Sequence, residues 1–304
     1  MEYMLTIVLA TFSGLIARLY MLRRDYRQYP SYPQGWAIHL FIGFIGALLG
    51  AILVPSLIEV EFAAVSFLLM AASQFREVRN IERSSLEKLE HTELVMRGTA
   101  YIEGIARVFE ARNYLAIWTA FIVAIVSEMT IHAGWMVQIP AALAAGAIAA
   151  GVLNQLMRGP SIGDIADVKM TEIGFDGPIL VVGGVSVMNV GLTTARERYL
   201  KQAVAAEIIP RDVEAKATLA NIGQMQAIAH DAAAMVGVYM DVGEQEFTPL
   251  VRRDPESGKL VMVMIPSEDN QEAFLEAVSN VPVLETAIRK PLRSIAGRMM
   301  DGRG

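Results

Sequence analysis

Five apolar segments in the first half of the chain are joined by connections that differ sharply in charge. The segments run at about Met4–Leu22, Trp36–Ile58, Val60–Phe75, Tyr114–Ile131 and Trp135–Met157. Residues 1–157 contain eleven Lys and Arg. Those near the end of the first segment and in the connection after it are Arg18, Arg23, Arg24 and Arg27. Those in the connection between the third and fourth segments are Arg76, Arg79, Arg83, Lys88, Arg97, Arg107 and Arg112. The remaining connections, Glu59–Glu61 and His132–Gly134, contain none. Lys and Arg concentrate in the cytoplasmic loops of membrane proteins, so the pattern predicts a membrane-spanning chain with its N-terminus outside.

The third segment, Val60–Phe75, decides how often the chain crosses. About 16 residues is near the lower limit for spanning roughly 30 Å of hydrocarbon, so a re-entrant segment is the alternative. If it did not cross, the Lys and Arg between Arg76 and Arg112 would lie outside, against the positive-inside rule. We therefore predict about five transmembrane helices in residues 1–157, with cytosolic connecting helices at 76–113.

Composition separates the second half from the first. The whole chain is 54% hydrophobic with a mean hydropathy of +0.40, which fits a protein that lies partly in a membrane. Residues 158–304 carry 15 Lys and Arg against 20 Asp and Glu, a net charge of −5. We expect a cytosolic α+β domain there, and an acidic domain argues against nucleic acid as a partner. The chain has no cysteine, which excludes disulfides and thiolate chemistry.

Small residues recur at spacings of three or four residues in two of the apolar segments. They are Gly43, Gly46 and Gly50 in one segment and Ala142, Gly146 and Ala150 in the other. Such spacing lets helix backbones approach closely in lipid. It indicates packing within the helical domain, with a homo-oligomer interface as the alternative.

Beyond residue 158 the pattern alternates between strands and helices. We expect strands near 165–173, 178–183, 236–242, 249–253 and 260–265, with a hairpin turn at Asp254–Gly258. Helices are predicted from Thr194, with a capping box to Glu197, as far as Glu207, and from Pro210 to about Met235. A further helix should begin with Ser267 as its cap and run to about Asn280.

The stretch just before the fourth apolar segment predicts an amphipathic helix at the cytosolic membrane face. Tyr101, Ile105, Val108 and Phe109 share one apolar stripe, while Glu103 and Arg107 are spaced for an i,i+4 ion pair. Gly104 costs about 1 kcal/mol relative to alanine inside a helix. A close approach by another helix or by a partner would compensate, so the candidate partner-binding residues are Tyr101, Glu103, Gly104 and Arg107. An ordinary interfacial helix docked on the bundle is the alternative.

The hexapeptide Tyr101-Ile102-Glu103-Gly104-Ile105-Ala106 resembles the motif that names the YIEGIA family of bacterial membrane proteins. The apolar N-terminal half, the place of the motif before a span and the chain length also fit that family. The resemblance implies an integral membrane protein linked to endospore formation that works with a small soluble capping-type partner. It implies no reaction.

Two further groups of polar residues are candidates for chemistry. Glu128 and His132 are spaced i,i+4 at the outer end of the fourth segment, and ionisable groups near a membrane are functional candidates. Asp164, Asp167 and Asp176 follow the last segment and could serve acid–base or cation-binding roles. An interfacial polar pair and turn-forming aspartates are the respective alternatives. His230-Asp231 resembles the paired residues of phosphohydrolases, but as a lone dipeptide.

These observations favour a membrane scaffold or regulatory protein whose cytosolic surface binds a protein partner. A transporter or channel is the alternative, followed by a membrane-bound hydrolase that uses the aspartates. No residue is assigned a catalytic role, and neither a cofactor nor a metal site is expected. The basic stretch from Arg289 to Arg303 fits either contact with anionic lipid headgroups or a solvated tail.

Overall fold

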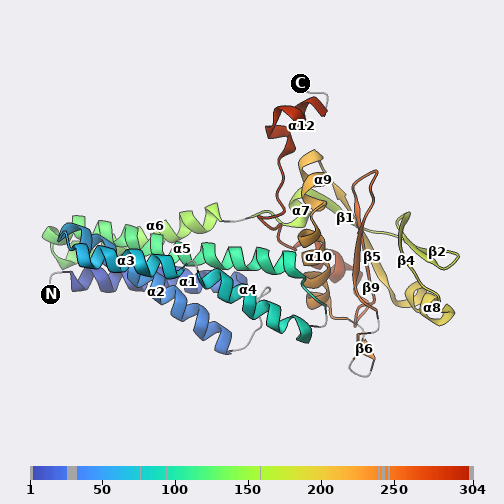
Figure 1. Ribbon diagram of the computed structural model, residues 1–304, viewed down its shortest axis with the longest axis horizontal. Coiled ribbons are helices and arrows are strands. Elements are labelled where there is room, and N and C mark those ends of the chain that lie inside the picture. The colour runs from blue at the N-terminus through green and yellow to red at the C-terminus, as the bar shows by residue number, and fades with distance from the viewer. Residues whose placement is uncertain are drawn as a thin grey trace. The chain divides into compact units, whose positions relative to one another are not determined.

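The computed structural model describes residues 3–25, 33–75, 77–93, 95–157, 159–238, 240–241, 244–245 and 247–300 (Figure 1). The helices are α1 (Met4–Asp25), α2 (Pro33–Ile58), α3 (Phe62–Phe75), α4 (Glu77–Leu89), α5 (Thr99–Met129), α6 (Trp135–Leu156), α7 (Ile162–Ile165), α8 (Thr193–Gln202), α9 (Val213–Leu219), α10 (Ile222–Val236), α11 (Gln271–Ser279) and α12 (Ile295–Met300). Short 3-10 turns are η1 (Glu90–Thr92), η2 (Ile131–Ala133) and η3 (Pro291–Arg293). The strands are β1 (Ala166–Met170), β2 (Ile173–Asp176), β3 (Ile179–Val182), β4 (Val185–Asn189), β5 (Val204–Pro210), β6 (Met240–Asp241), β7 (Glu244–Gln245), β8 (Leu250–Arg253) and β9 (Leu260–Met264).

The chain forms two compact units. Unit 1 comprises Met1–Ser85 and Ile105–Arg158, and unit 2 comprises Leu86–Gly104 and Gly159–Gly304. The connection predicted at 76–113 is therefore divided between the units. Its middle part belongs with the α/β region, and the break at Gly98 separates α4 from α5.

Unit 1 is a helical bundle that contains apolar helices of membrane-spanning length. Among the described residues, four helical stretches are long and apolar enough to cross a membrane: Met4–Leu22, Gly35–Ile58, Thr99–Met129 and Trp135–Leu156. α3 has only 14 residues, roughly 21 Å of helix, and falls short of that length. The hexapeptide does not form a separate surface helix, because α5 runs unbroken for 31 residues and includes both the hexapeptide and the fourth apolar segment as far as Met129.

Alanine and glycine bring the helix backbones of unit 1 together. The buried cluster of this unit consists mainly of alanine from four helices: Ala10, Ala47, Ala51, Val54, Ala116, Ala120, Val123, Ala124 and Ala142. A Cβ at Gly50 would collide with the backbone oxygen of Ile117, and one at Gly146 would lie 3.1 Å from Ser13. The small residues singled out in the sequence thus pack within the chain, as close helix contacts in lipid require.

The path of α3 runs along the bundle. The Tyr3 hydroxyl donates to Glu59 at 2.6 Å, which places the α2–α3 turn beside the start of α1. At the other end, Arg79 of α4 lies 3.9 Å from Glu110 of α5. Glu110 is roughly 25 Å along α5 from Ser127, whose hydroxyl hydrogen-bonds Thr6 of α1 at 2.8 Å. α3 and the start of α4 therefore cover most of the length between the two ends of the bundle.

Unit 2 is built on a four-stranded antiparallel sheet in the order β1-β5-β9-β8. β9 is buried along its whole length. Its Val261 and Val263 pack with Ala205 of β5 against the second sheet, β2-β3-β4, and against Tyr199 of α8. Alternate residues of a strand point to the opposite face, which α10 and α11 cover (Figure 1). The expected α+β character is confirmed at this level: an α/β region with antiparallel sheets.

Three predictions of local structure in unit 2 are wrong. The helix expected to reach Glu207 ends at Gln202, and residues from Val204 form β5, the strand between β1 and β9. α8 also lacks the predicted capping box and begins after Leu192 without a side-chain cap. Asn270 rather than Ser267 caps α11, accepting from the Ala273 amide at 2.9 Å. Ser267 instead donates to the Val236 carbonyl.

Glycine substitutions test the close packing of unit 1. Gly50→Ala places a methyl group against the Ile117 carbonyl, so we expect a loss of roughly 1–3 kcal/mol of stability from overpacking. Gly151→Ala is the matched control because a Cβ there meets nothing within 4 Å, and it should be neutral or slightly stabilising. Thermal unfolding of the purified protein in detergent measures both. Equal melting temperatures for the two variants would contradict this packing.

Candidate functional site

The hexapeptide lies at the beginning of α5, and its side chains are mostly buried. Tyr101, Ile105 and Ala106 are fully enclosed, and Ile102 is 1% exposed. Gly98 precedes the helix with φ of +78°, a conformation that glycine adopts without strain. Its amide donates to Glu90 Oε1 at 2.6 Å, which closes the 90–98 loop.

Two buried hydrogen bonds connect this segment to α10 within unit 2. The Tyr101 hydroxyl donates to Asp231 Oδ1 at 2.6 Å. His230 Nδ1 lies 2.6 Å from the Val95 carbonyl oxygen, which only accepts, so this nitrogen carries the proton. Burial lowers the pKa of His230 and the nearby Arg97 lowers it further, so the ring is neutral at pH 7. His230 and Asp231 therefore hold the 95–101 segment, rather than forming a phosphohydrolase pair.

The four predicted partner-binding residues have different surroundings. Tyr101 is buried, and a Cβ at Gly104 would lie 3.4 Å from the Leu284 methyl groups, an ordinary packing distance. Glu103 is half-buried and Arg107 is exposed. The neighbour of Gly104 is thus Leu284 of the same chain, and the unusually close approach expected at this glycine is not observed. Of the four side chains, those of Glu103 and Arg107 reach the surface.

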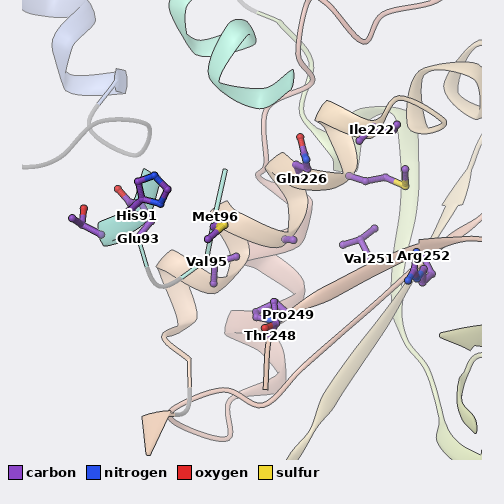
Figure 2. Close-up of a pocket in the computed structure, with 13 residues that line it drawn as sticks. His91, Glu93, Val95, Met96, Ile222, Gln226, Thr248, Pro249, Val251 and Arg252 are labelled. Carbon is purple, nitrogen blue, oxygen red and sulfur yellow. The ribbon is translucent and has the colours of Figure 1, made fainter. Parts of the chain in front are cut away.

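An open cleft of about 770 Å³ lies beside the loop that precedes α5 (Figure 2). Residues of the 91–96 loop, of α10 and of the chain around β8 line it: His91, Thr92, Glu93, Val95, Met96, Ile222, Met225, Gln226, Ala229, Thr248, Pro249, Val251 and Arg252. Met96 and Ile222 are 63% and 65% exposed, although both side chains are large and apolar. We call this the α10–β8 cleft. The sequence contains no local signal for it, because its walls come from three distant segments.

The polar groups of the α10–β8 cleft suit recognition better than reaction. Glu93 forms an ion pair with Arg97 at 2.6 Å, and Arg252 donates to the Val187 carbonyl at 3.3 Å. Gln226 Oε1 is buried and has no hydrogen-bond partner among the described residues. No described group of three or more His, Asp or Glu side chains could hold a metal ion.

The three predicted aspartates do not converge on one centre. Asp164 accepts from the Ser161 amide at 2.7 Å and caps α7, which lowers its pKa. Asp167 pairs with Arg211 at 2.9 Å, and Arg211 also donates to the Asp164 carbonyl. Asp176 lies in β2, in the other sheet, beside a separate cavity of about 480 Å³. The first two aspartates therefore have structural contacts that account for their positions.

Glu128 and His132 also remain apart. Glu128 is half-buried near the end of α5, and His132 is exposed in η2. No hydrogen bond or ion pair joins them in the described structure. Helical spacing does not hold beyond Met129, where α5 ends, so the i,i+4 geometry expected from the sequence is lost.

Arg18 is the functional candidate that sequence reasoning missed. We grouped it with the loop arginines, but it lies inside α1 and is fully buried. A Cβ at Gly43 would lie 2.6 Å from Arg18 Cγ, so glycine provides room for the side chain. The guanidinium carbon is 5.4 Å from the centre of the Phe109 ring. Nearby, burial raises the pKa of Glu82 in α4 to about 7, partly opposed by Arg18. The sequence signal that could have identified Arg18 is its position as a single arginine within an otherwise uncharged apolar segment.

Removing the Tyr101 hydroxyl tests whether this segment holds α10 in place. Tyr101→Phe removes the donor to the buried Asp231 carboxyl group, and a buried acceptor left without its partner costs roughly 1–3 kcal/mol. We expect amide hydrogen exchange in α10 to accelerate about tenfold or more. Tyr199→Phe is the matched control, since Tyr199 is also buried in unit 2 and its hydroxyl bonds none of the described residues. Unchanged exchange in α10 of Tyr101→Phe would contradict the assignment.

The chain is similar to known proteins over nearly its whole length. The family model described as "YIEGIA protein" matches residues 6–294. A Bacillus subtilis (strain 168) protein described as "Uncharacterized protein YphB" is 41% identical over 294 residues, which is 97% of each chain. No solved structure matches the chain. The match over nearly the whole length shows that this chain belongs to the YIEGIA family.

Proposed function

We propose that this protein is an integral membrane scaffold that holds unit 2 at the cytosolic face and there binds a small soluble protein. The observation that carries the proposal is the α10–β8 cleft, with its exposed apolar side chains on an otherwise acidic α/β unit. The link to endospore formation and a capping-type partner rests on the family resemblance, and both belong to this proposal.

The proposed topology has five crossings, an outer N-terminus and a cytosolic unit 2. Four helical stretches have the length and apolarity of membrane spans. α3 is short, but it leads from the turn at Glu59, beside the start of α1, to the level of Arg79 and Glu110. This path favours a crossing, because a re-entrant segment would return to the end from which it started. The distribution of Lys and Arg supports the same arrangement.

The α10–β8 cleft has the properties of a polypeptide-binding surface. Exposed Met96 and Ile222 offer apolar anchors, and methionine adapts its shape to a partner. Polar groups such as His91, Thr248 and Arg252 surround them. An apolar centre with a polar rim is the usual composition of protein interfaces. Gln226 lines the same cleft and adds a further polar side chain to its rim.

A transporter or channel is the second candidate, favoured by polar groups buried inside unit 1. Arg18 is fully enclosed, and Thr6, Ser127 and Gln138 form a buried hydrogen-bonded set near the other end of the bundle. Ionisable residues inside membrane helices are functional candidates. The hydrolase alternative has weaker support, because Asp164 and Asp167 are engaged by Ser161 and Arg211.

Labelling of introduced cysteines tests the topology, and the chain has no native cysteine to interfere. Cysteine is placed at the exposed positions Glu61, Ser85 and Ser257 in separate variants. In intact cells an impermeant thiol reagent should label the Glu61 variant and leave the other two unlabelled until the cells are opened. Labelling of Ser85→Cys or Ser257→Cys at the rate of Glu61→Cys would overturn the five-crossing arrangement.

Site-specific crosslinking tests the α10–β8 cleft. A photoreactive amino acid at Met96 should crosslink a small soluble protein in cells forming endospores. Leu192, 72% exposed in the same unit, is the matched control position and should give no such adduct. Adding Ile222→Glu to the Met96 probe should reduce the adduct at least about tenfold, because a charge replaces an apolar anchor. An adduct of equal yield at Leu192, or one that survives Ile222→Glu, would contradict the assignment of the cleft.

A further inference from the structure

The segment from Arg289 to Met300 differs in charge from the rest of its unit. Residues 159–288 carry 9 Lys and Arg against 19 Asp and Glu, a net charge of −10. Residues 289–300 carry four basic residues and no acidic one. All four are exposed: Arg289, Lys290, Arg293 and Arg298. The segment is therefore net positive, whereas residues 159–288 are net negative.

Large apolar side chains are exposed in the same segment. Ile295 and Met299 are each 67% exposed. They are four residues apart in α12, so they lie on the same side of the helix. Figure 1 shows α12 projecting from unit 2 away from its sheets. Water is an unfavourable environment for such a pair of side chains, and basic residues flank them.

The segment has a defined local structure. The Arg289 amide donates to Thr218 Oγ1 of α9 at 3.2 Å, which ties the start of the segment to the unit. Ser294 accepts from the Gly297 amide at 3.0 Å and caps α12. A Cβ at Gly297 would collide with the Pro291 carbonyl, so glycine lets α12 fold back onto η3. These contacts fold residues 289–300 into one short stretch that contains both the basic and the exposed apolar side chains.

We propose that residues 289–300 dock on a bilayer surface that contains anionic lipid. Apolar side chains that enter the boundary between headgroups and acyl chains, together with Lys and Arg on the headgroups, form the usual interfacial anchor. The charge contrast favours lipid over a protein partner, since this segment of an acidic unit is complementary to an anionic membrane. The inference rests on the proposed membrane location, and it adds a second attachment beyond the helices of unit 1.

The test uses the full-length protein in lipid nanodiscs with one introduced cysteine, Ile295→Cys, carrying an environment-sensitive fluorophore. Discs contain either phosphatidylcholine alone or phosphatidylcholine with phosphatidylglycerol, and both include a lipid with a nitroxide on its acyl chain. We expect a blue-shifted emission and strong nitroxide quenching only in the discs with phosphatidylglycerol. High salt should reverse both effects, because it screens surface charges. Ser257→Cys, exposed in the β8–β9 turn, is the matched control and should respond to neither lipid.

Charge removal separates lipid docking from other contacts. Arg293→Ala and Arg298→Ala should each weaken docking roughly fivefold, as expected for one basic residue at an anionic surface. Quenching that is absent in phosphatidylglycerol discs would overturn the proposal. A blue shift that is equal in both lipids would also overturn it, since it would indicate a protein contact. Nanodiscs expose both bilayer faces, so the result does not depend on the cellular topology. Partner binding at the α10–β8 cleft is tested separately by crosslinking at Met96, so the two proposals can fail independently.

Discussion

The hydrogen bond between Tyr101 and Asp231 ties the first turn of α5 to α10, and the organisation of unit 2 around its cleft depends on this connection. The residues that precede Tyr101 return from α4 and lie over α10, where Val95 is buried and binds His230. Residues 86–104 are therefore part of the fold of unit 2 and not a linker. They also form one wall of the α10–β8 cleft. One short segment thus determines both the start of the longest apolar helix and the shape of the candidate binding surface.

Apolar segments could be located from the sequence because membrane-spanning length is a local property. Hydropathy does not report where a helix begins, however. The amphipathic helix at Tyr101 and the apolar segment from Tyr114 were therefore predicted as separate elements, whereas both lie in α5, which begins at Thr99. The same limit applies to β5. Val204–Glu207 contains alanine and glutamate, which favour helix, but its place between β1 and β9 determines the strand. Strand propensity depends on such neighbours more than on the residue itself.

The candidate site was less predictable than the fold. The hexapeptide identifies the family, yet Tyr101 and Gly104 face inward, where Asp231 and Leu284 contact them. Nothing near these residues in the sequence indicates contacts more than a hundred positions away. Changes at Tyr101 are therefore expected to loosen unit 2 before they affect a partner. The residues that test binding directly are Met96 and Ile222, which no motif marked.

Arg18 connects the charge pattern of the sequence with the packing of unit 1. In the proposed topology its backbone lies inside a span, while the guanidinium extends toward Phe109 and Glu82 at the cytosolic end. A long side chain of this kind satisfies the positive-inside rule even when it is buried. The other buried polar set, Thr6 with Ser127 and Gln138, lies toward the opposite end. Between the two ends, the helix backbones pack closely at glycine and alanine residues. Such packing leaves little room for a transport pathway between the helices, so it favours the proposed membrane scaffold over the transporter or channel.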